Sequence, residues 1–255
     1  MKSGKSNHQG FSYKNSKGVP HKFEPTKQAE FIEHYKALKA QVTDEPILFI
    51  DAMHPTQATK VSSGWIKTGQ DKSIETTGSR TRLNIVGAID LNNIGAAIVS
   101  RFDKVNSETL QAFFETIRQQ YPSKKEIHLI LDGAGYHRAK DLINKAKELK
   151  ITLHYLPPYS PNLNPIERLW KVMNEHVRNN QYFSTAKQFR EKMDDFFQKT
   201  LPKIGDSLTS RINDNFQVLN PASSSILGIY SRKKLCFFLL AEIVIDLGLK
   251  PAETK

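Results

Sequence analysis

The feature that most constrains the fold is an alternation of β-rich and helical segments in the middle of the chain. An apolar β-rich segment at 126–131 precedes an amphipathic segment at 139–150. A second β-rich segment covers 151–156, and another amphipathic helix begins at Ile166. Alternating strands and helices of this length are typical of α/β folds that contain parallel strands. The chain therefore needs a sheet with helices packed against it.

Three further β-rich segments come before this alternation, at residues 46–53, 81–93 and 95–102. A polar turn separates the last two, which predicts an antiparallel hairpin. The expected architecture is therefore an α/β fold in which a three-strand antiparallel meander continues into parallel strands, flanked by helices. Helical patterns are also predicted at 25–40, 107–121, 186–199 and 203–218.

The composition indicates a polyanionic partner. The 255 residues include 37 Lys and Arg against 26 Asp and Glu, a formal net charge of +11. Such a balance favours nucleic acid as the partner. Cys236 is the only cysteine, which excludes an internal disulfide scaffold and a cysteine-rich zinc module. The apolar segment 235–249 carries Glu242 and Asp246, so it is not expected to span a membrane. We expect a soluble, cytoplasmic protein.

Three acidic residues stand where strands or helices begin or end. Asp51 ends the apolar segment ILFI, and Asp132 ends the apolar segment IHLIL. If those two strands pair, the carboxylates lie side by side, and a cation is needed to neutralise their repulsion. Glu167 occupies the first turn of the helix that follows YSPNLNP, at the edge of its apolar stripe. That stripe consists of Ile166, Leu169, Trp170, Met173 and Val177.

Three carboxylates without a cysteine ligand suit Mg²⁺ or Mn²⁺. Two such ions, roughly 3.5–4 Å apart, can clamp the attacking and leaving oxygens of an in-line phosphoryl displacement. The chain has no GxxxxGK[ST] phosphate loop, so a nucleotide-binding mechanism is not indicated. The alternative is that Asp51 and Asp132 are turn or cap residues and that Glu167 pairs with Lys171 along the helix.

Three sequence blocks resemble the catalytic blocks of bacterial insertion-sequence transposases of the Tc/mariner superfamily. They are LFIDAMHPT, IHLILDGAGYHRA and LPPYSPNLNPIERLW, and residues 133–166 leave 34 positions between Asp132 and Glu167. The resemblance implies a ribonuclease H-like DDE endonuclease domain with Asp51, Asp132 and Glu167 as the metal-binding catalytic triad. It also implies a bacterial, nucleoid-associated protein that acts on transposon ends and target DNA. Because two DNA ends must react, a homodimer is expected in the active complex.

Other residues are candidates for positioning or DNA contact. His137 can position a DNA phosphate or a water molecule beside the metal, or it can simply cap a helix or be exposed. Trp65 lies in a basic loop, where DNA contact and packing are both open. Trp170 belongs to the apolar stripe and is expected in the core. The remaining DNA-contact candidates are Lys67, Arg80, Arg82 and Arg168.

The sequence divides into three parts. Residues 1–40 are interpreted as a basic leader and linker helix, the remnant of an upstream helix-turn-helix region. Residues 41–221 form the expected catalytic domain, and residues 222–255 form an atypical C-terminal tail, with a short amphipathic helix outside the nuclease core. Two alternative functions remain open: another ribonuclease H-like nuclease, such as a hybrid hydrolase or junction resolvase, or an inactive truncated transposase that only binds DNA.

Overall fold

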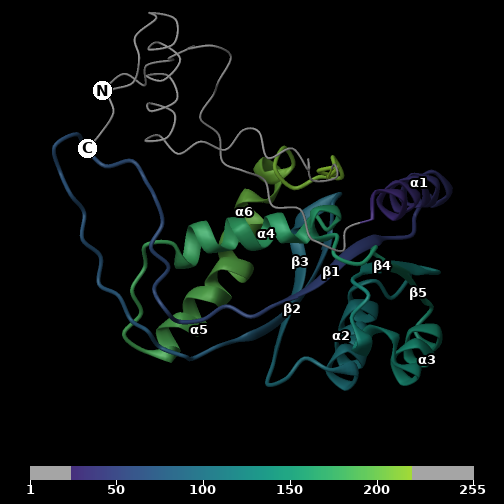
Figure 1. Cartoon of the computed structure of the whole chain (residues 1–255). Helices are drawn as coiled ribbons and strands as arrows, with labels where there is room; N and C mark the ends of the chain where they lie inside the picture. Colours follow the sequence, from purple (N-terminus) through teal and green to yellow (C-terminus); the bar gives the residue numbers. More distant parts are fainter. Residues whose placement is uncertain (1–23, 220–255) are drawn as a thin grey trace, which may run out of the picture. The chain divides into compact units, whose positions relative to one another are not determined.

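The β-rich segments join in one five-stranded sheet with the order β3-β2-β1-β4-β5 (Figure 1). The computed structural model describes residues 24–219. The strands are β1 Ile47–Met53, β2 Asn84–Asp90, β3 Asn93–Phe102, β4 Ile127–Leu131 and β5 Ile151–Tyr155. The helices are α1 Pro25–Gln41, α2 Ser107–Gln120, α3 Lys140–Glu148, α4 Ile166–Met173, α5 Ala186–Asp195 and α6 Leu201–Ile204.

Strand β1 lies at the centre of the sheet and joins its two halves. It pairs antiparallel with β2, which pairs antiparallel with β3, and it pairs parallel with β4, which pairs parallel with β5. The predicted mixed sheet, a meander that continues into parallel strands, is therefore confirmed. The hairpin turn falls at Leu91 and Asn92, since Asp90 pairs with Asn93.

Two hydrophobic clusters cover the two faces of the sheet. Because successive side chains of a strand point to opposite faces, Leu48 and Ile50 pack with α2 and α3, whereas Phe49 packs with α1, α4 and α5. Figure 1 shows α2 and α3 together, apart from α4, α5 and α6. Both faces of β1 are thus buried, as expected for strands covered by helices on both sides.

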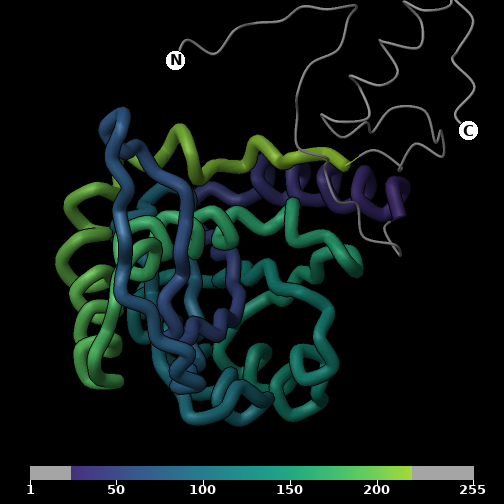
Figure 2. The backbone as a smooth tube through the Cα atoms, turned by 60° about the vertical axis from the view of Figure 1, so that its left-hand side comes forward, coloured from purple at the N-terminus to yellow at the C-terminus, as the bar shows by residue number. Residues whose placement is uncertain are grey.

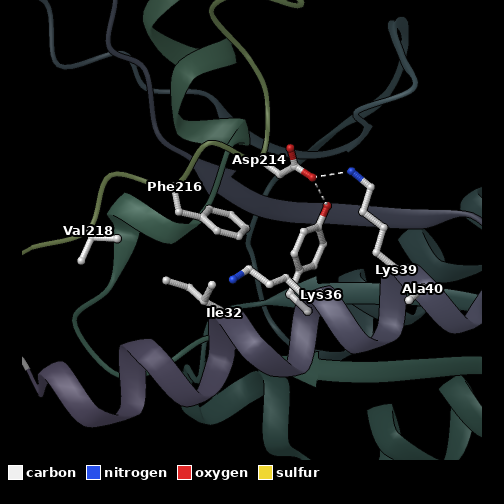
Figure 3. Close-up of a pocket in the computed structure, with 8 residues that line it drawn as sticks. Ile32, Lys36, Lys39, Ala40, Asp214, Phe216 and Val218 are labelled. Carbon is white, nitrogen blue, oxygen red and sulfur yellow. Dashed lines mark hydrogen bonds and ion pairs between the residues drawn. The ribbon is translucent and has the colours of Figure 1, made fainter.

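The predicted helix at 203–218 is wrong. Helical structure ends with a 3-10 turn at Gly205–Leu208, and the following residues run as an irregular segment beside α1 (Figure 2). Contacts with distant residues hold this segment. The Asp214 carboxylate accepts hydrogen bonds from Tyr35 and Lys39 of α1, and Phe216 packs edge-on against Tyr35 (Figure 3). The backbone carbonyls of Asn213 and Asn215 accept hydrogen bonds from the Arg168 guanidinium of α4, so a tertiary partner replaces the helical hydrogen bonds expected there.

Residues 54–83 form a long connection between β1 and β2 that extends from the sheet (Figure 2). We call this connection the arm. Its two halves lie side by side, because the backbone N–H of Gln57 donates to the carbonyl of Thr81 and that of Thr59 donates to the carbonyl of Thr77. Trp65 lies in the distal part of this arm and is fully exposed. The sequence predicts a long loop or hairpin here, and the structure shows a long loop whose two halves run side by side.

By its internal contacts the chain divides into two units, Met1–Asn220 and Pro221–Lys255. All described residues belong to the first unit. Within it, no helix is long and apolar enough to cross a membrane. The predicted basic leader up to residue 23 and the predicted amphipathic helix of the tail lie outside the described residues.

Candidate active site

Asp51 lies on β1, and Asp132 directly follows β4, the parallel neighbour of β1. The pairing of β1 with β4 aligns Phe49 with Ile130, and the two acids follow two residues later on each chain segment. Asp132 comes directly after β4, as predicted, but Asp51 lies inside β1, which continues to Met53 through its pairing with β2. The register of β1 and β4 therefore places the two acids at equivalent positions of adjacent chain segments.

Glu167 reaches the same region from the first turn of α4. The loop before this helix is anchored to the sheet by Asn164, whose side-chain Nδ2 donates to the carbonyl of Ile50 at 3.0 Å. The carbonyl of Asn164 in turn accepts a hydrogen bond from the backbone N–H of Glu167 at 3.2 Å. One buried asparagine thus ties Glu167 to the residue that precedes Asp51.

The three acidic residues line one pocket of about 430 Å³. The opposite wall is formed by the proline-rich segment that connects β5 to α4, with Pro157, Pro158 and Pro161 among its residues. Tyr159 of this segment is exposed and has a φ of 56°, a left-handed conformation that bulky residues rarely adopt. The pocket is therefore acidic on the sheet side and stiff on the loop side.

Burial, followed by the negative charges of Glu167 and, more weakly, Asp132, raises the pKa of Asp51 to about 7, although hydrogen bonds from Trp170 and the Ala52 backbone oppose the shift. Burial also raises the pKa of Glu167, which the charge of Lys171 partly offsets. Burial is the main cause of both shifts, and repulsion from neighbouring carboxylates adds to the shift of Asp51 alone. Such shifts are common at catalytic sites.

His137 is a buried partner of Asp132. Its Nδ1 lies 2.5 Å from Oδ1 of Asp132 and 3.0 Å from the carbonyl oxygen of the same residue. This interaction, together with a hydrogen bond from the backbone N–H of Ala134, lowers the pKa of Asp132. His137 is therefore neither exposed nor a helix cap: it holds the Asp132 carboxylate.

The donor set fits a hard divalent cation in kind. Among residues 24–219, no three His, Cys, Asp or Glu side chains lie close enough together to hold one ion as they stand. However, three carboxylates line one pocket, and a bound cation would offset both the burial of the Asp51 charge and its repulsion from Glu167. Oxygen ligands without sulfur are those that Mg²⁺ and Mn²⁺ prefer.

The remaining candidates are spread over the domain. Lys67, Arg80 and Arg82 are exposed, the first two along the arm that carries Trp65 and the third at its base. Arg168 points away from the pocket, and its guanidinium donates to the backbone carbonyls of Asn213 and Asn215 at 2.9 Å and 2.8 Å. The structure brings none of these residues into the acidic pocket.

Sequence reasoning missed three residues of this site. Trp170 is buried in the core, as expected, but its indole Nε1 also donates to Oδ2 of Asp51 at 2.8 Å. A buried tryptophan N–H usually has a hydrogen-bond acceptor, so the core position of Trp170 could have predicted a polar partner. No local sequence pattern indicated that Asn164 or Arg138 belongs to the site. Both residues line the pocket, and Arg138 directly follows His137.

Comparison with known proteins agrees with the fold and identifies the family. Residues 46–190 match the DDE superfamily endonuclease family, and this range contains all three acidic residues. The match covers more than half of the chain, so the chain belongs to that family. This confirms the family that the three sequence blocks indicated.

Individual relatives are more distant. The chain is 25% identical over 183 residues to the insertion element IS630 uncharacterized 39 kDa protein of Shigella sonnei, a match that covers 71% of this chain and 53% of the relative. The chain thus spans about half the length of that relative. Among solved structures, the Mos1 strand transfer complex is similar with a TM-score of 0.57 and 18% identity, covering 80% of this chain and 64% of that one. The Mos1 mariner paired-end complex with Mn gives a TM-score of 0.56 and 17% identity, covering 82% and 69%. These likenesses show a shared fold.

Proposed function

We propose that this chain is the catalytic part of a transposase that cuts DNA at the ends of an insertion sequence and joins the 3′-hydroxyl to target DNA. The observation that carries the proposal is the convergence of Asp51, Asp132 and Glu167 on one pocket from β1, β4 and α4. The family to which the chain belongs, its likeness to an insertion-element protein and its net charge of +11 support DNA as the substrate.

We further propose that Asp51, Asp132 and Glu167 hold two Mg²⁺ or Mn²⁺ ions. When bound, such ions activate the attacking water or 3′-hydroxyl and stabilise the departing oxyanion. The residues of this chain hold the ligands in place: His137 holds Asp132, Trp170 holds Asp51, and Asn164 fixes the start of α4. The structurally similar Mos1 complex with Mn supports the metal class.

The proposal extends to assembly, location and domain organisation. Because transposition joins two ends, we propose that two copies act together in a homodimer on DNA, in the bacterial cytoplasm at the nucleoid. We also keep residues 1–40 as a leader and linker, 41–221 as the catalytic domain and 222–255 as a tail. Mass measurement of the protein with and without end DNA tests the dimer.

The direct test is cleavage of DNA that carries the inverted repeats flanking the gene. The full chain with Mg²⁺ or Mn²⁺ should nick this DNA, and Asp132→Asn should abolish nicking. Asp71→Asn, in the exposed arm, is the matched control and should leave nicking intact. Equal nicking by Asp132→Asn and the wild-type chain would refute the assignment of the triad.

Two outcomes separate the alternative functions. Nicking without any strand-transfer product on a plasmid target, or faster cleavage of an RNA–DNA hybrid, indicates another ribonuclease H-like nuclease. Salt-sensitive DNA binding without cleavage under any divalent metal indicates an inactive remnant that only binds DNA.

A further inference from the structure

Arg138 is the only cationic residue among those that line the acidic pocket. It ends the 3-10 turn Gly135–Arg138, which follows Asp132 by three residues. Within residues 24–219, no carboxylate forms an ion pair with its guanidinium, although three acidic residues share the pocket with it. The donors of this side chain therefore remain available to a ligand.

Two neighbours hold the guanidinium in place. Its Cζ lies 4.7 Å from the centre of the Tyr155 ring, a cation–π arrangement. The guanidinium also lies near Gly133, where a Cβ would come within 3.3 Å of a terminal nitrogen of Arg138. The guanidinium therefore lies close to the Gly133 backbone, where a side chain would crowd it.

Tyr155 also fixes the turn that carries the arginine. Its hydroxyl donates to the backbone carbonyl of His137 at 2.9 Å, while the ring of the same residue supports Arg138. Tyr155 of β5 thus orients the guanidinium, which lies beside Gly133. An arginine held in this way has lost part of its side-chain freedom before a ligand arrives, which favours tight, oriented binding.

We infer that Arg138 binds a phosphate group of the nucleic-acid strand that enters the acidic pocket. The planar guanidinium donates two parallel hydrogen bonds to a phosphodiester, and this match explains why an unpaired arginine lies beside three carboxylates. Arg138 thereby offsets the repulsion between the DNA backbone and the acidic wall. This inference rests on the proposed function, because it takes DNA as the substrate of the same pocket.

The test measures DNA binding rather than cleavage, so its result does not depend on whether the chain cleaves DNA. The full chain is titrated, without divalent metal, against a short fluorescent DNA duplex of arbitrary sequence over a range of salt concentrations. Each phosphate contact contributes about 0.9 to the slope of log affinity against log salt. Arg138→Gln should reduce the slope by about that amount. Arg138→Lys should keep the slope with weaker affinity, and Arg190→Gln, which removes an exposed arginine of α5, should match the wild type.

A second measurement uses the wild-type chain and needs no variant. Phenylglyoxal modification of arginines, read by mass spectrometry, should be several-fold slower at Arg138 when the duplex is bound, and unchanged at Arg190. Equal modification of Arg138 with and without DNA, or an unchanged salt slope for Arg138→Gln, would overturn the inference. A wild-type chain that binds DNA with Arg138 protected but never cleaves it would instead remove the proposed function and leave the phosphate contact standing.

Discussion

The indole N–H of Trp170 donates a hydrogen bond of 2.8 Å to Oδ2 of Asp51, and this bond connects α4 to the central strand at the acidic pocket. Gly87 makes the arrangement possible. It pairs with Asp51 across β1 and β2, and a Cβ at this position would lie 2.4 Å from Cη2 of Trp170. The glycine therefore leaves the space in which the tryptophan ring lies over the sheet and reaches the carboxylate.

Trp170→Phe removes the donor but keeps an aromatic ring in the core. Because partners of metal-binding groups typically affect metal affinity or activity by roughly 10–100-fold, we expect cleavage at limiting Mg²⁺ to fall within that range. Higher Mg²⁺ should recover part of the activity. Cleavage rates over a Mg²⁺ series measure this, and Tyr182→Phe, at an exposed position outside the pocket, serves as the control. A metal dependence equal to that of the wild type would show that the bond does not position Asp51.

Gly87→Ala introduces a methyl group into the space occupied by Trp170. Overpacking of this kind lowers the free energy of unfolding by about 1–3 kcal/mol. Urea denaturation followed by tryptophan fluorescence measures the change. Gly64→Ala is the matched control, since a Cβ there meets no atom within 4 Å. Equal stability of the two variants would contradict the packing that we describe.

His154 predicts a pH dependence of stability. Its Nδ1 lies 2.9 Å from Nε2 of His34, and its Nε2 lies 3.1 Å from Nδ1 of His128. Burial, followed by the charges of His128 and His34, lowers the pKa of His154 from its ordinary 6.5 to about 4, although Glu126 partly opposes this.

The unfolded chain therefore binds a proton at His154 near pH 6.5, whereas the folded chain does so only near pH 4. Protonation of His154 should therefore lower the free energy of unfolding as the pH decreases through this window, by on the order of 1 kcal/mol after allowance for solvent screening of a partly exposed ring. Protonation of Asp51, whose pKa is raised in the folded chain, acts in the opposite direction, so the contribution of His154 is the difference between the wild type and His154→Gln. Urea denaturation at pH 7 and pH 5 measures the loss. His154→Gln should reduce it, while His54→Gln, at an exposed position, should not. An unchanged loss in His154→Gln would count against this explanation.

Arg168→Gln separates a structural role from DNA contact. In the structure this side chain holds the segment after Leu208 through the carbonyls of Asn213 and Asn215. We expect the free energy of unfolding to fall by about 1–3 kcal/mol, as for the loss of charged hydrogen bonds, with no change in the salt slope of DNA binding. The opposite pattern, weaker DNA binding with unchanged stability, would restore the sequence-based interpretation of Arg168 as a DNA contact.

Much of the fold could be predicted from local patterns. The apolar strand segments, the hairpin and the stripe from Ile166 to Val177 depend on residues near each other in the chain, and all five stripe residues are buried. The sequence also predicted that Asp132 follows a strand and that Glu167 lies in the first turn of a helix. Both positions could be predicted because proline, glycine and polar residues mark the ends of strands and helices. Asp51 was predicted at the end of its strand, whereas it lies inside β1, which continues to Met53.

The sequence by itself thus determined the order of the strands and of most helices, and it indicated the three acidic residues that the structure brings to one pocket. Only the tertiary structure decided what holds those residues. The bond from Trp170 to Asp51 joins positions 119 residues apart, and that from Arg168 to Asn213 joins positions 45 residues apart. The contacts of Arg138 likewise depend on β4 and β5 lying side by side. Local periodicity carries no information about such partners, because they meet only when the sheet has paired and the helices have packed on it.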